Sequence, residues 1–164
     1  LGKCDKMSTT KMLNYLDTRS KILLSIDNNI VISDDNISSY PIILICDNDY
    51  LKLNNREVSI LGNHLKQGGL LILDNVISDY TFSIFLDKIL PQSNTESFSL
   101  DTLFSDNPFN INLDKVELDL EAIFINKKLS ILAIKKASLI NYWQEENEEF
   151  FKIGSSIIFY NLTR

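Results

Sequence analysis

Five acidic and amide residues stand directly after two apolar runs of the sequence: Asp47, Asn48, Asp49, Asp74 and Asn75. The runs are Ile42–Cys46 and Leu70–Leu73. If both runs are neighbouring parallel strands, these side chains meet at the carboxyl edge of the sheet, where open α/β sheets bind ligands at a switch point in strand order. Carboxylates there could bind Mg²⁺ or Ca²⁺, or share a proton as an acid/base pair. Turn chemistry is the simpler alternative, because Asp and Asn commonly end strands.

A cysteine nucleophile is the other reaction chemistry to consider. Cys46 ends the first apolar run, and His64 is the single histidine of the chain. A nucleophilic cysteine needs a tight strand-to-helix elbow and a placed base, and no Gly-x-Cys-x-Gly pattern surrounds Cys46. A Ser-His-Asp triad meets a similar objection, because His64 would have to be its base and no sequence pattern places His64 beside a serine. We therefore expect a buried strand-end thiol at Cys46, an imidazole on a helix surface at His64, and no catalytic residue.

The two cysteines, Cys4 and Cys46, also have no metal-ligand spacing and indicate no disulfide framework. A cysteine at the end of an apolar run usually packs as a small hydrophobic residue. Sulfur chemistry is therefore not expected to shape this fold.

The segment between the two apolar runs predicts the element that positions them. Asn54 and Glu57 have the spacing of a capping box, so a helix is expected to begin there. Gly68 fits the left-handed position that ends a helix, and Gly69 permits close approach of the helix to the next strand. One helical face carries the apolar side chains Val58, Leu61 and Leu65. A helix that feeds a buried parallel strand is the repeating unit of an open α/β sheet.

Periodicity elsewhere completes the predicted fold. It predicts further helices over residues 8–19, 80–90 and 141–162, and strands or strand-like runs over residues 22–26, 30–32, 96–100, 120–125 and 129–134. We expect one α/β domain over residues 1–164, with a three-layer, mostly parallel open sheet and helices on both faces.

Composition narrows the classes of partner. The chain has 164 residues, 45% of them hydrophobic and 23% charged, which suits one domain with a sizeable core. The net charge is -6, and the dense cationic pairs are Lys127-Lys128 and Lys135-Lys136, so no nucleic-acid partner is expected. No run approaches the roughly 20 apolar residues of a membrane span, and no signal-peptide pattern is present. Because the chain begins with Leu1, it could be a fragment of a longer one, and both a cytoplasmic and an exported location stay open.

Several segments, taken in order, carry a family resemblance: Tyr40-Pro41, Glu57, Leu61, Leu65, Gly68-Gly69, Leu70–Asp74, Leu100-Asp101 with Leu103-Phe104, Asn141-Tyr142-Trp143, and Ile153-Gly154 through Tyr160. They resemble the bacterial domain-of-unknown-function family numbered 4159. That family is similar in fold to class I glutamine amidotransferases and to ThuA-like proteins, so the resemblance implies a flavodoxin-like arrangement. Two departures from its pattern are Cys46–Asp49, in place of a turn with glycine and histidine, and Thr102, in place of a histidine.

The expected function is that of an uncharacterised, non-catalytic glutamine amidotransferase-like domain. It is expected to bind a protein partner or a small molecule at the carboxyl edge of the sheet, without a cofactor or metal. The ligand-binding residues would be Asp47, Asn48, Asp49, Asp74 and Asn75. One alternative is a carboxylate- or metal-dependent hydrolase that uses Asp47, Asp49 and Asp74. Another is a structural module whose aromatic residues, Phe104, Phe109 and Trp143, meet a partner.

Overall fold

A mixed five-stranded sheet runs through the centre of the molecule in the order β1-β2-β5-β4-β3. The computed structural model describes residues 4–20, 22–28, 30–91, 96–98, 104, 108–112 and 116–163. The strands are β1 Ile42–Cys46, β2 Leu70–Val76, β3 Glu96–Phe98, β4 Asp119–Ile125 and β5 Lys128–Lys135. β2 pairs in parallel with β1 and with β5, whereas β4 pairs antiparallel with β5 and β3. The predicted mostly parallel sheet is therefore half antiparallel, because the β4–β5 hairpin joins it directly.

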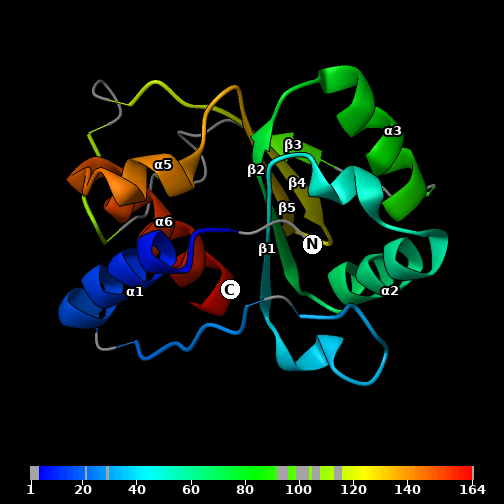
Figure 1. The fold of residues 1–164 in the computed structure, drawn as a ribbon, viewed down its shortest axis with the longest axis horizontal. Helices are drawn as coiled ribbons and strands as arrows, with labels where there is room; N and C mark the ends of the chain where they lie inside the picture. Colours follow the sequence, from blue (N-terminus) through cyan, green and yellow to red (C-terminus); the bar gives the residue numbers. More distant parts are fainter. Residues whose placement is uncertain are drawn as a thin grey trace.

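Helices lie on either side of this sheet (Figure 1). They are α1 Lys6–Ser20, α2 Asn55–Lys66, α3 Asp79–Ile89, α5 Leu139–Gln144 and α6 Glu148–Thr163, with short 3₁₀ turns at Ile37–Ser39 (η1) and Asp49–Lys52 (η2). One apolar core lies between the sheet and α1, α5 and α6, and a second lies between the sheet and α2 and α3. The predicted α/β class and open sheet are thus confirmed.

The cap and the glycine turn of α2 form as the sequence predicts. The Glu57 N–H donates to Asn54 Oδ1 over 3.0 Å, and the Asn54 N–H donates to Glu57 Oε2 over 2.9 Å. Gly68 has a φ of 99°, which a side chain rarely tolerates. A Cβ added at Gly69 would lie 1.9 Å from His64 Nε2, so the bare glycine lets the helix end pack on the start of β2.

That close packing corrects the expectation for His64. The residue is only 5% exposed rather than on the helix surface, and its buried Nε2 atom has no hydrogen-bond partner among the described residues. Burial lowers the pKa of the imidazole, because a charged ring would lose its hydration there. His64 is therefore a packing residue of the α2–β2 connection.

Two predicted elements differ in the structure. Residues 22–28 and 30–32 form no strand, although their β-branched and apolar residues favour one. The predicted helix over residues 141–162 is divided into α5 and α6, because Glu146 has a φ of 59° and ends the first helix. Trp143 fixes the corner: its Nε1–H donates to Phe150 O over 2.9 Å, and its side chain is buried.

Candidate functional site

The structure brings one pair of the predicted strand-end residues into contact. β1 and β2 are parallel neighbours in which Cys46 aligns with Asp74, so both strands end at the same edge. The next residues, Asp47 and Asn75, have φ values of 54° and 63°, and Asn75 Nδ2 donates to Asp47 Oδ1 over 3.0 Å. Asp and Asn tolerate this left-handed conformation better than other residues with side chains. The pair therefore links the two turns that leave the sheet.

Asp74 is directed elsewhere. It is 1% exposed, and its carboxylate accepts a hydrogen bond of 2.6 Å from Ser138 Oγ and one of 2.7 Å from the Leu139 N–H. Burial raises the pKa of Asp74, and the hydrogen bonds from Ser138 and Leu139 act against that rise. Since Ser138 is the N-cap of α5, this carboxylate fastens the end of β2 to the start of that helix.

The other two strand-end residues belong to η2. Asp49 is buried and forms an ion pair with Lys52, one turn later. Asn48 precedes the same turn and makes no capping hydrogen bond with its side chain. The carboxylates of Asp47, Asp49 and Asp74 thus have three different partners. Within the described residues, no group of three or more His, Cys, Asp or Glu side chains is placed to hold a metal ion.

A disulfide bond replaces the free thiol expected at Cys46. Cys4 and Cys46 are bonded, with their Cα atoms 5.4 Å apart and a separation of 42 positions in the sequence. The N-terminal segment passes the carboxyl end of β1, which brings the two residues within bonding reach. The cysteine spacing cannot reveal this approach, because it depends on the path of the whole intervening chain.

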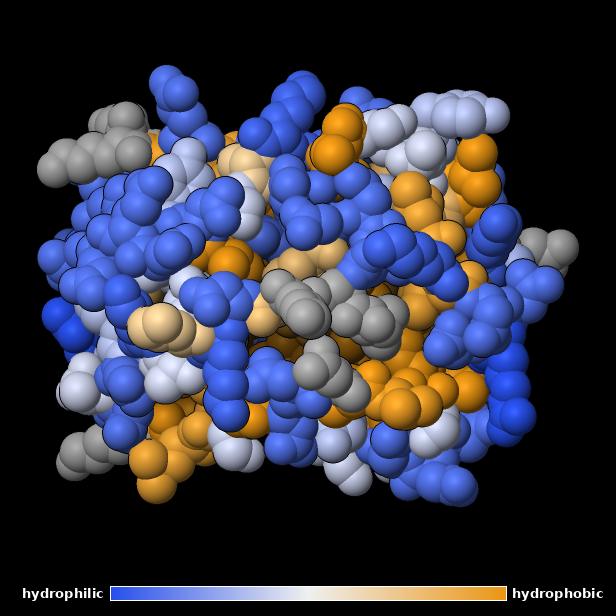
Figure 2. Space-filling model, in the orientation of Figure 1, coloured by the Kyte–Doolittle hydropathy of each residue, from blue (hydrophilic) through white to orange (hydrophobic). Residues whose placement is uncertain are grey.

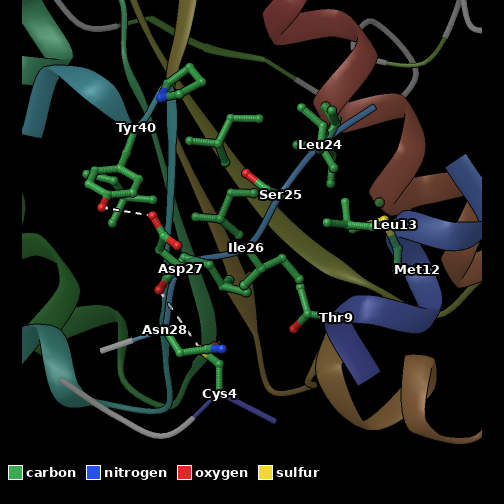
Figure 3. Close-up of a pocket in the computed structure, with 18 of the residues that line it drawn as sticks. Cys4, Thr9, Met12, Leu13, Leu24, Ser25, Ile26, Asp27, Asn28 and Tyr40 are labelled. Carbon is green, nitrogen blue, oxygen red and sulfur yellow. Dashed lines mark hydrogen bonds between the residues drawn. The ribbon is translucent and has the colours of Figure 1, made fainter. Parts of the chain in front are cut away.

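A cavity of about 440 Å³ lies along the outer side of β1. Its walls come from α1, β1, α5, α6 and the extended residues 23–28 (Figure 3), and we call it the β1 groove. Apolar side chains that line it include Met12, Leu13, Leu44, Ile157 and Ile158. Hydrophobic atoms also gather near the middle of the face drawn in Figure 2.

One end of the β1 groove is polar. Asp27 is the charged residue among the described residues that line it, and its Oδ2 accepts a hydrogen bond of 3.0 Å from Tyr40 OH. The sequence reasoning missed this groove, because its lining comes from stretches that are far apart in the chain. The available signal was the apolar run at residues 22–26, which favours a strand but pairs with no strand of the described residues.

A second feature lies where the strand order reverses. α3 follows β2 on one side of the sheet and α5 follows β5 on the other, so the switch point lies between β2 and β5 rather than between β1 and β2. Lys135 stands at this edge, with Nζ 2.7 Å from Asp79 Oδ1 and 2.6 Å from Glu121 Oε2. Burial disfavours the ammonium group, but the two carboxylates outweigh it and raise the pKa of Lys135. The ammonium group of Lys135 is thus held between the carboxylates of Asp79 and Glu121.

These observations define a mixed α/β domain with a disulfide at the end of its edge strand and an apolar groove beside it. The sequence model of the family described as a domain of unknown function (DUF4159) matches residues 3–162, so the chain belongs to that family. No curated protein matches the chain. In the part of the chain that the structure describes, no helix has the length and apolar character needed to cross a membrane.

Proposed function

We propose that this chain is a non-catalytic binding domain of the glutamine amidotransferase-like type, with helices on both faces of its sheet, and that its ligand occupies the β1 groove. The observation that carries the proposal is the cavity of about 440 Å³, lined mainly by apolar side chains. Ligand pockets are usually about 300–1,000 Å³ in volume and combine apolar walls with a few polar groups. The Asp27–Tyr40 pair supplies polar groups at one end.

The state of the candidate catalytic groups supports a binding role. The sulfur of Cys46 is bonded to Cys4, and a disulfide sulfur has no thiolate for nucleophilic attack. His64 of α2 is buried against Gly69, and no described residue offers its Nε2 a polar partner. A nucleophile needs a base within hydrogen-bond reach. Among the described residues, Cys46 and His64 therefore cannot serve as a nucleophile and its base.

The predicted site at the strand ends receives less support. Three separate contacts already engage these carboxylates. Asp47 hydrogen-bonds with Asn75 between two turns, Asp49 pairs with Lys52 within η2, and Asp74 accepts from Ser138 at the start of α5. Those contacts account for the residue types without a ligand, and they would have to break before the carboxylates could act together in a hydrolase. The structural-module alternative required exposed aromatic residues that could meet a partner. Two of its three candidates, Phe104 and Trp143, are buried.

Titration with Nile red, a neutral dye that fluoresces in apolar surroundings, tests the proposal. We expect saturable binding of one dye per chain. Leu13→Trp, which places a larger ring in the groove, should weaken it about tenfold or more, as expected when a ligand loses its pocket. Ile84→Trp on α3 is the matched control, because Ile84 is 38% exposed on the opposite side of the sheet. Non-saturable binding, or equal affinities in both variants, would overturn the proposal.

A further inference from the structure

In the part of the chain that the structure describes, no strand pairs with the outer edge of β1. β1 is the terminal strand of the sheet, bonded to β2 on its other side. The Leu70 N–H donates to Pro41 O over 2.9 Å, which sets the alternation of this parallel ladder. By that alternation, the N–H and C=O groups of Ile42 and Leu44 point away from β2. Two donors and two acceptors therefore face outward, beside the β1 groove.

The contacts on this side agree with that direction. Cys4 Sγ lies 3.9 Å from Leu44 O, so the N-terminal segment meets the outward face of the strand there. Residues 22–28 run past the groove (Figure 3), but among the described residues no backbone hydrogen bond joins them to β1. Their polar contact with the β1 side is the Asp27–Tyr40 hydrogen bond, to the residue that precedes Pro41. Among the described residues, Cys4 and residues 22–28 thus border the outer edge of β1 without a backbone hydrogen bond to it.

We infer that the ligand of the β1 groove is an extended, basic segment of a partner protein, which adds a strand to β1. This inference rests on the proposed binding function and names the ligand class. An added strand supplies backbone partners for the N–H groups of Ile42 and Leu44 and for the C=O of Ile42, whereas Leu44 O keeps its contact with Cys4 Sγ. Because side chains alternate along a strand, every second residue of the segment enters the apolar groove.

Charge favours a basic segment. Asp27 is the charged residue among the described lining residues, and the whole chain has a net charge of -6. A lysine or arginine beside Asp27 would complement both. An anionic lipid fits less well, since its head group would meet this carboxylate. Its acyl chain would also cover the outward groups of Ile42 and Leu44 without hydrogen-bonding them, which is unfavourable.

Selection from a library of random twelve-residue peptides displayed on phage, against the whole protein, tests the inference. We expect enriched peptides with alternating apolar residues and at least one Lys or Arg, and we expect them to compete with Nile red. Hydrogen exchange measured by NMR on the complex should slow roughly tenfold or more at the amides of Ile42 and Leu44. The amides of Ile43 and Ile45 already point to β2 and serve as internal controls.

Two kinds of variant complete the test. A synthetic copy of an enriched peptide, N-methylated at alternate residues on its bonding edge, should lose binding because it lacks the donors for β1. Asp27→Asn should weaken a lysine-containing peptide up to about fivefold, the effect of one exposed ion pair. Asp34→Asn, a change at an exposed carboxylate outside the groove, should have no effect.

Each negative outcome has a distinct meaning. Selection that yields no peptide competing with Nile red would overturn the inference, as would peptide binding without protection of Ile42 and Leu44. Anionic vesicles that compete with Nile red where peptides do not would point to a lipid ligand and also overturn it. In all these cases, saturable Nile red binding would leave the proposed binding function intact. If Nile red does not bind saturably, both the proposed function and this inference are wrong.

Discussion

Reduction of the Cys4–Cys46 disulfide should destabilise the protein strongly. The bond closes a loop across 42 positions that contains α1, residues 22–28 and β1. Opening a loop of this length increases the conformational entropy of the unfolded chain by an amount worth about 4 kcal/mol at 25 °C. For a chain of this size, such a loss corresponds to a fall in Tm of roughly 8–16 °C.

Urea unfolding with and without reductant measures this loss. The chain has a single tryptophan, Trp143, which is buried in the core beside α1, so its fluorescence reports unfolding. With an m value of about 2 kcal/mol per M, the midpoint should fall by roughly 2 M. The double variant Cys4→Ala/Cys46→Ala is the control. Its urea midpoint should equal that of the reduced protein and should not change when reductant is added. A loss below about 1 kcal/mol would refute the entropy argument.

The same bond bears on the compartment. Disulfides persist in oxidising surroundings and are rare where thiols are kept reduced. Of the two locations that the sequence leaves open, the disulfide favours export.

Three further predictions concern the packed turns of the sheet. Burial lowers the pKa of His64 below its usual 6.5, so the unfolded chain binds the proton more readily than the folded one. The free energy of unfolding should therefore fall as the pH drops below 6.5, by at most about 1.4 kcal/mol per pH unit. His64→Leu should remove this part of the pH dependence. Gly69→Ala should cost about 1–3 kcal/mol in urea unfolding, because the new Cβ would clash with the imidazole, and adding His64→Ala should recover part of the loss; additive effects would contradict the contact. Asp74→Asn should cost about 1–3 kcal/mol in the same assay, because the amide satisfies only one of the two donors at the start of α5; a change under 0.5 kcal/mol would contradict this role.

Features that depend on neighbours in the sequence were predictable. The capping box of Asn54 and Glu57, the left-handed Gly68 and the apolar runs of β1 and β2 each follow from a few adjacent residues. The parallel pairing of the two runs followed from the helix between them. From this pairing we predicted that the whole strand-end set would meet, whereas only Asp47 and Asn75 of that set are in hydrogen-bond contact among the described residues.

Features that depend on long-range approach were missed. Cys4 meets Cys46 only because α1 and the following segment return the chain to the end of β1. His64 is buried only because β2 starts immediately beneath the last turn of α2. Residues 22–26 have strand-forming side chains but no paired neighbour, and propensity alone does not supply one. The β1 groove, which combines these stretches, was invisible to local patterns for the same reason.

Asp74 has a consequence for the ligands this protein can accept. In open α/β sheets, the start of the helix after a strand is where the phosphate or carboxylate of a bound ligand often rests. Here the chain places its own carboxylate there, held by Ser138 and the Leu139 N–H. Asp74 therefore behaves as a built-in substitute for a ligand, and a phosphate approaching α5 would meet a position that is already filled and negative. An anion at this end of the sheet would therefore have to displace a carboxylate that belongs to the protein itself.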